Sequence, residues 1–220
     1  MDTLRKHEIF EIELLEKLKN ANFLRPLVFS GGTMMRLCYD LNRYSTDLDF
    51  WFIRKVAQKD YFEKIKKGLA ASYEITDAQM KFNTLLFEIR SKNYPKRLKI
   101  EIRRGLKKCD YEERIAFSRY GTLQVILKVH TLEQMMKNKI AAALDRKDIR
   151  DVFDIEFLLR QGVSLPEQKN ELIKLKKIIN RFKDKDYKVA LGSVLERETR
   201  NLYIKNKFDY LVKKINLAVV

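Results

Sequence analysis

The sequence contains few of the residues on which several common kinds of functional site depend. Cysteine occurs only at Cys38 and Cys109, in unrelated contexts. A disulfide framework and paired metal-ligand spacing are therefore both absent, and a reducing cytoplasm is the expected compartment. Histidine occurs only at His7 and His130, so neither a histidine-rich metal site nor a histidine-based catalytic triad is expected.

Long apolar runs are also missing. No stretch is long enough to cross a bilayer, and the N-terminus, Met-Asp-Thr-Leu-Arg-Lys, lacks the apolar core of a signal peptide. There is no internal repeat and no low-complexity linker. A chain of 220 residues can form one large domain or two small ones around a substantial core. We expect a folded cytoplasmic protein with no membrane partner.

Acidic residues are outnumbered, and the formal net charge is +16. Between Arg90 and Lys108 there are nine Lys and Arg residues but a single acid, Glu101. From Pro166 onward, basic residues are twice as numerous as acidic ones. Such a surface favours a polyanionic partner such as a nucleic acid. The alternative is a lysine-rich surface that serves solubility alone.

The most informative stretch runs from residue 27 to residue 52. An apolar segment leads into a glycine turn and a short helical segment, and a second apolar segment carries Asp47 and Asp49. Residues i and i+2 of a strand share a face, so these carboxylates would project together, which is costly without a cation. Backbone N–H groups at the start of a helix suit phosphate. The pattern predicts a site for a nucleoside triphosphate and a divalent metal, with the turn formed by Ser30, Gly31, Gly32 and Thr33. Taken separately, the turn could be an ordinary loop and the acids a solvated strand edge.

This stretch resembles the nucleotidyltransferase AbiEii/AbiGii toxin family, a branch of the DNA polymerase β-like nucleotidyltransferase superfamily. The resemblance lies in GGT, a short helix and then RYSTDLDF, and it extends over roughly residues 25 to 165. Thr33 replaces the commoner serine and keeps the hydroxyl. Arg43 and Ser45 match the family's R-x-S-x-DLD pattern, which implies that they orient the loop before Asp47 and bind nucleotide.

A third carboxylate is expected on a later strand. The segment Leu98 to Arg103 alternates cleanly, with Glu101 on its charged face. This pattern alone describes an amphipathic strand with a solvated face, but the resemblance places the family's third acid at Glu101. Asp47, Asp49 and Glu101 would then hold two Mg²⁺ ions roughly 3.5–4 Å apart.

The second half of the chain changes to helical periodicity near residue 130. Thr131, with Gln134 three residues later, predicts a capping box for a helix over residues 132–146. Lys139 and Arg146 project from the apolar stripe of that helix, and a lysine there requires an outward path or an anionic partner. Asp151 and Asp154, three residues apart on the next helix, are the candidate partners. A purely structural salt bridge between the two helices is the alternative.

The same region resembles the family's second block, in KIAAALDRKDIRDVFDI. The resemblance implies that Lys139 and one aspartate, Asp151 or Asp154, are needed for activity, and that Arg146 and Arg150 belong to the motif. Lys139 would neutralise charge on the nucleotide and Arg146 would help to bind it.

We therefore expect an α/β (α+β) fold in which a polymerase β-like mixed sheet of four to six strands is flanked by helices. Residues 1–130 would form the nucleotidyltransferase sheet domain with an N-terminal helix over residues 3–20. Residues 131–220 would form a helical domain that completes the active-site cleft. Further predicted elements are a helix over 58–71, strands over 82–89 and 121–129, a hairpin turn over 91–97, a basic helix over 167–183 and a helical C-terminus.

The expected activity is Mg²⁺-dependent transfer of a nucleoside monophosphate from an NTP to RNA. The resemblance implies a tRNA 3′ end as acceptor, and a toxin paired with an antitoxin that regulates transcription, in a type IV-like toxin–antitoxin or abortive-infection system. One alternative is a nucleotidyltransferase that modifies a protein or a small molecule. Another is a basic protein that binds nucleotide or nucleic acid without catalysis.

Overall fold

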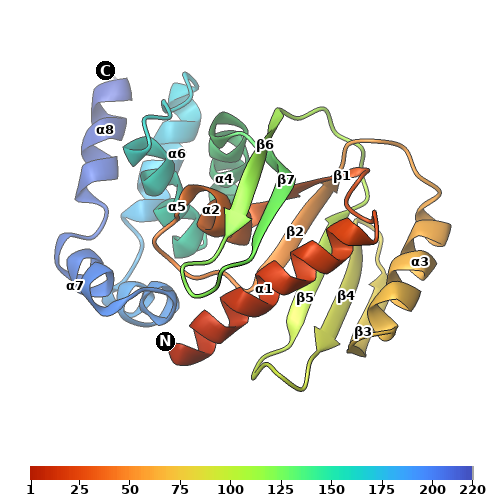
Figure 1. Ribbon diagram of the computed structural model, residues 1–220. Helices are drawn as coiled ribbons and strands as arrows, with labels where there is room; N and C mark the ends of the chain where they lie inside the picture. The colour runs from red at the N-terminus through yellow and green to blue at the C-terminus, as the bar shows by residue number, and fades with distance from the viewer. Residues whose placement is uncertain (220) are drawn as a thin grey trace. The chain divides into compact units, whose positions relative to one another are not determined.

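A computed structural model describes residues 1–219 of the chain and confirms the α/β class (Figure 1). Its elements, in chain order, are α1 (Asp2–Asn20), β1 (Leu27–Ser30), α2 (Gly31–Tyr39), β2 (Asp47–Phe52), α3 (Gln58–Ala70), β3 (Glu74–Met80), β4 (Thr84–Arg90), β5 (Leu98–Arg103), β6 (Tyr111–Phe117), β7 (Gln124–His130), α4 (Leu132–Arg146), α5 (Ile149–Arg160), α6 (Lys169–Ile179), the π-helical turn η1 (Asp186–Leu191), the 3₁₀ turn η2 (Gly192–Val194), α7 (Arg197–Asn206) and α8 (Asp209–Val219).

The sheet has seven strands in the order β3-β4-β5-β2-β1-β7-β6, and so the expectation of four to six strands was too low. The two strands that the sequence pattern did not predict, β3 and β6, form the two edges. Most of their residues are exposed or half-buried, and they lack the alternation of apolar and polar residues that marks a half-buried strand. Edge strands are held by one neighbour only, so their sequences carry a weaker apolar signal.

The sheet is mixed because β2 pairs parallel with β5 and antiparallel with β1. Apolar and polar residues alternate strictly in β5. One face of β2, β5 and β4 is apolar and buried, and Phe50, Ile100 and Phe87 lie on it. Helix α3 packs on this face through Phe62, whose ring stacks on Phe87 with centroids 4.8 Å apart. The opposite face of β2 and β5 carries the polar residues.

Helix α1 lies along the sheet and contacts β7 and β5 (Figure 1). Its buried Glu8 accepts hydrogen bonds from Arg36 Nε on α2 at 2.7 Å and from Ser118 Oγ at 2.7 Å. Buried charges are tolerated when they are paired and hydrogen-bonded in this way. Glu8 thus fixes α1 to the last turn of α2 and to the loop after β6.

The chain forms two compact units. The first contains Met1–Asp40 and Tyr44–His130, and the second contains Leu41–Arg43 together with the chain from Thr131 onward. The three residues 41–43 thus belong to the second unit, although they lie between α2 and β2 in sequence.

The second unit is helical. Helix α4 has the predicted bounds, and Thr131 Oγ1 accepts the N–H of Gln134 at 3.2 Å, as expected for its N-cap. Glu156 on α5 accepts hydrogen bonds from Tyr203 Oη at 2.9 Å and from Arg160 Nη2 at 2.9 Å, and it thereby ties α5 to α7. The helix expected over residues 167–183 is shorter, since α6 covers Lys169–Ile179. None of the helices in residues 1–219 has both the length and the apolar character needed to cross a membrane.

Candidate active site

The three predicted acidic residues lie on one face of two neighbouring strands. Asp49 of β2 is directly opposite Glu101 of β5, and Asp47 is opposite Lys99. Because side chains two residues apart share a face, Asp47, Asp49 and Glu101 all project from the side of the sheet opposite Phe50 and Ile100. The parallel pairing of β2 with β5 therefore brings together acids that are more than fifty residues apart in sequence.

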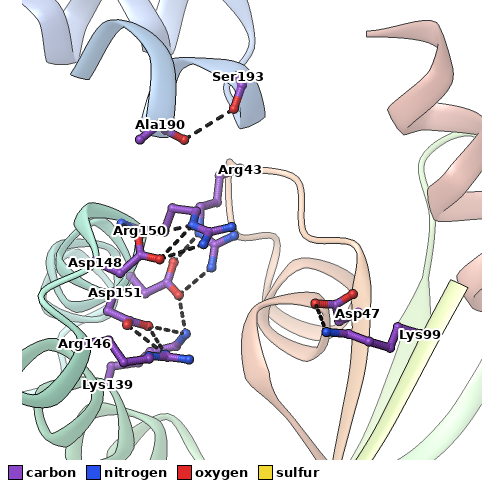
Figure 2. Close-up of polar contacts among 11 residues, drawn as sticks. Arg43, Asp47, Lys99, Lys139, Arg146, Asp148, Arg150, Asp151, Ala190 and Ser193 are labelled. Atoms are coloured by element: carbon purple, nitrogen blue, oxygen red, sulfur yellow. Dashed lines mark hydrogen bonds and ion pairs between the residues drawn. The ribbon is translucent and has the colours of Figure 1, made fainter. Parts of the chain in front are cut away.

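A lysine lies between two of these acids. Lys99 Nζ is 2.8 Å from Glu101 Oε1 and 3.5 Å from Asp47 Oδ2 (Figure 2 shows the contact with Asp47). Burial lowers the pKa of Lys99, but the hydrogen bond to Glu101 and the two negative charges outweigh this and raise the pKa above its ordinary value. The lysine therefore stays charged and neutralises part of the acidic cluster. Within residues 1–219, no three carboxylate, imidazole or thiol groups are arranged to hold a metal ion directly.

Asp49 lies against the glycine turn. Gly31 has φ +82°, a conformation that side chains disfavour, and a Cβ at this position would collide with the Asp49 carboxylate. Ser30 at the end of β1 is also the register partner of Asp49. The Asp49 carboxylate thus lies beside the N-terminus of α2, where the helix dipole favours negative charge.

The hydroxyl groups of the predicted nucleotide-binding turn make internal hydrogen bonds. Thr33 Oγ1 donates to the carbonyl oxygen of Asp47 at 2.7 Å, which ties the first turn of α2 to the start of β2. Ser30 Oγ lies 2.9 Å from His130 Nδ1. Burial lowers the pKa of His130 to about 4, so its imidazole is neutral at pH 7. Both hydroxyls therefore fix the sheet and helix around the acids, whereas Gly31 and Gly32 contribute backbone alone.

An aromatic residue with two cations lies next along the same face of β2. Trp51 follows Asp49 by two residues and pairs with Arg103 in the sheet register. The Arg103 guanidinium lies 5.1 Å from the centre of the Trp51 ring and the Lys107 ammonium 5.7 Å from it. These are cation–π distances. A half-buried ring beside two cations can stack on a nucleobase while the cations meet phosphate.

In the second unit, Lys139 and Asp154 form a buried ion cluster with Arg43. Figure 2 labels Lys139 and Arg43. Asp154 has no exposed surface and receives Arg43 Nε at 2.6 Å, Arg43 Nη2 at 2.7 Å and Lys139 Nζ at 2.6 Å. Burial raises the pKa of Asp154, but the charges of Arg43 and Lys139 and their hydrogen bonds lower it below its ordinary value. Asp154 is therefore an ionised counter-ion. With no exposed surface, it cannot touch a substrate in this conformation.

Asp151 joins the same cluster from the other side. Its Oδ1 lies 3.2 Å from Lys139 Nζ, and its two oxygens accept from Arg146 Nη2 at 2.9 and 2.8 Å. The expected partners of Lys139 are thus confirmed.

Arg150 instead pairs with Asp148, the N-cap residue of α5. The predicted nucleotide-binding residue Ser45 is half-buried just before β2.

An open pocket of about 440 Å³ lies beside this cluster within the second unit. Arg146 and Asp148 line it. The other lining residues are Lys147, Ile149, Arg150, Phe182, Asp186 and Ala190. Three basic and two acidic side chains line the opening, and Arg146 and Arg150 are already paired with Asp151 and Asp148.

Two features of the site were missed by sequence reasoning. The first is the ion pair of Lys99 with Glu101 and Asp47. The alternating strand placed Lys99 on the same face as Glu101, two residues away, but it did not identify the partners of the lysine. The pair of Arg43 with Asp154 joins residues 111 positions apart, and no local pattern could predict it.

The mixed sheet thus presents Asp47, Asp49 and Glu101 on one face beside the glycine turn. Two solved structures from Helicobacter pylori share the fold. JHP933 has a TM-score of 0.54 and 22% identity, over 94% of each chain. A structure described as a nucleotidyltransferase has a TM-score of 0.53 and 22% identity, over 94% of this chain and 96% of that one. No curated protein matches the chain in sequence.

The chain belongs to the AbiEii family, because the family model "Nucleotidyl transferase AbiEii toxin, Type IV TA system" matches residues 13–206. It is therefore a nucleotidyltransferase and the toxin of a type IV toxin–antitoxin system.

Proposed function

We propose that this toxin transfers a nucleoside monophosphate from an NTP to an RNA acceptor, the 3′ end of a tRNA, with Mg²⁺ as the cofactor. The observation that carries the proposal is the shared face of Asp47, Asp49 and Glu101 beside the Gly31 turn. Carboxylate oxygens are the ligands that Mg²⁺ prefers. The amides at the N-terminus of α2 suit the phosphates that would accompany it.

The oxygen donors on this face suit a divalent metal, although within residues 1–219 the carboxylates are not arranged to hold one in this conformation, where Lys99 lies between Asp47 and Glu101. Asp47 and Glu101 already share one cation, the Lys99 ammonium, and their carboxylates supply oxygen donors on one face. Mg²⁺ held by Asp47, Asp49 and Glu101 would lower the pKa of the attacking hydroxyl and neutralise the triphosphate. The chain's own contribution is to hold the three carboxylates in register, through the β2–β5 ladder and the Thr33 hydrogen bond to Asp47.

Lys139 and Arg146 are the proposed phosphate-neutralising residues of the second unit. Three cations, Arg43, Lys139 and Arg146, face only two carboxylates in the cluster, which leaves one positive charge in excess. The role proposed for Asp151 and Asp154 is to position these cations. Arg43 lies four residues before Asp47, so its pair with Asp154 would also fix the loop that leads into β2.

The proposed acceptor is RNA because cations and an aromatic ring lie next to the acids. Trp51 with Arg103 and Lys107 offers a stacking surface beside phosphate-binding charges, and the whole chain carries +16. A cytoplasmic toxin with such a substrate would be restrained by its antitoxin, for which we propose a transcriptional regulator.

The test is incubation with each α-labelled NTP and Mg²⁺, with separate RNA and protein pools as acceptors. Wild type should label tRNA, Asp49→Asn should not, and Asp77→Asn should behave as wild type. Asp77 is the matched control because it lies on edge strand β3, where the Gln79 side chain donates to it. Label in the protein pool would favour the alternative acceptor. RNA binding and growth arrest that survive in Asp49→Asn would favour a non-catalytic binding protein.

A further inference from the structure

We propose that Lys99 holds the place of the divalent cation between Asp47 and Glu101, and that binding of the metal displaces its ammonium group from the two carboxylates. This inference rests on the proposed function, because it concerns the same acidic face. It adds that the metal site is occupied by an internal cation whenever the metal is absent.

The geometry makes Lys99 and a metal ion compete for the same position. The ammonium lies 2.8 Å from Glu101 Oε1 and 3.5 Å from Asp47 Oδ2. Mg²⁺ binds oxygen at about 2.0–2.1 Å, and a metal that is held by both carboxylates must therefore sit between them. Two cations cannot share that space, since their repulsion would oppose the attraction of each for the acids. The lysine must leave before the metal can bind both residues.

The exchange is feasible because the cluster is open to water. The side chain of Lys99 is 36% exposed, that of Glu101 36% and that of Asp47 44%. Ion pairs of this exposure are weak, and the flexible stem of lysine allows the ammonium to swing away. Once released on this face, the ammonium can donate to a phosphate oxygen of the nucleotide.

A functional consequence follows for the protein without nucleotide. Lys99 relieves the repulsion between the carboxylates, so the site remains formed without a metal. The same contact weakens binding of free metal. Metal that arrives with a triphosphate brings extra ligands and offers the lysine a new partner, and it can therefore displace the ammonium more readily.

The first experiment measures Mn²⁺ binding to the full chain by calorimetry without nucleotide. Lys99→Met should bind Mn²⁺ roughly three- to thirtyfold more tightly than wild type, because two partly exposed ion pairs no longer compete. Lys99→Gln should behave similarly. Lys128→Met, which removes a half-buried lysine of β7 that contacts the Arg25 carbonyl oxygen, should match wild type. Unchanged, weaker or undetectable binding by the Lys99 variants overturns the inference.

The second experiment uses unaltered protein and reductive methylation of lysines, read by mass spectrometry. Saturating Mg²⁺ should increase the methylation rate of Lys99 several-fold and leave Lys128 unchanged. A rate for Lys99 that is unaffected or lowered by Mg²⁺ overturns the inference. Neither readout requires transfer activity, so failure here leaves the proposed reaction standing, and failure of transfer leaves these results interpretable.

Discussion

The buried cluster around Asp154 allows a sharp prediction about stability. In Asp154→Asn, a carboxylate with no exposed surface loses its charge while Arg43 and Lys139 stay buried beside it. Breaking a buried pair by removing one partner costs about 3–5 kcal/mol, because the remaining charges lack compensation. For a chain of 150–250 residues this lowers the melting temperature by roughly 6–20 °C.

Asp151→Asn is the matched comparison because the same chemical change is made three residues away. Its partner Arg146 is 59% exposed and can return to water, and Lys139 keeps Asp154. The expected loss is smaller, about 1–3 kcal/mol. Urea unfolding followed by far-ultraviolet circular dichroism gives both values. The reasoning would be refuted if Asp154→Asn lowered the free energy of unfolding by less than about 1 kcal/mol. It would also be refuted if Asp151→Asn lowered that free energy by more than Asp154→Asn does.

Three further predictions concern the first unit. Burial holds the pKa of His130 at about 4, below its unfolded value near 6.5, so protonation favours the unfolded state. The free energy of unfolding should therefore fall by about 3 kcal/mol as the pH drops from about 6.5 to about 4. His130→Gln should flatten this fall in acid titrations followed by thermal melting; an unchanged slope would contradict the assignment. Gly31→Ala should lower the free energy of unfolding by about 1–3 kcal/mol and abolish transfer. Two glycine variants serve as controls. Gly162→Ala, at φ +90° with open space around it, should lose stability through backbone strain alone, and Gly121→Ala should have almost no effect. Trp51 is the only tryptophan, so the protein's tryptophan fluorescence reports on this ring alone. Stacking of a base on Trp51 should quench this fluorescence when RNA binds, and Trp51→Ala should weaken RNA binding by about 1–3 kcal/mol per stacked base. Unchanged emission would exclude stacking.

Sequence periodicity predicted the central elements well because each buries one side against the core and leaves the other side polar. The alternation from Leu98 to Arg103 gave β5 its full bounds and placed Glu101 on the polar face. The helix over 132–146 was equally clear, because its cap and its apolar stripe agree. The edge strands β3 and β6 were missed because exposed strands need no apolar alternation.

Partners of the polar residues were harder to predict than their positions. The sequence required an anion for Lys139 and offered Asp151 and Asp154 nearby, and that local inference was confirmed. The contact of Arg43 with Asp154 depends on tertiary packing across 111 positions. The family resemblance supplied Glu101 as the third acid, and the parallel register of β2 with β5 then put it opposite Asp49.

The most direct measurement is transfer of α-labelled nucleotide to tRNA by Glu101→Gln, with Glu113→Gln on the exposed edge strand β6 as the control. Glu101 lies on a different strand from the DxD pair, and the sheet register and the Lys99 ammonium join it to that pair. The account predicts that Glu101→Gln folds normally but no longer labels tRNA, while Glu113→Gln labels it at the wild-type rate. Wild-type labelling by a folded Glu101→Gln protein would contradict the claim that the three carboxylates form one active site.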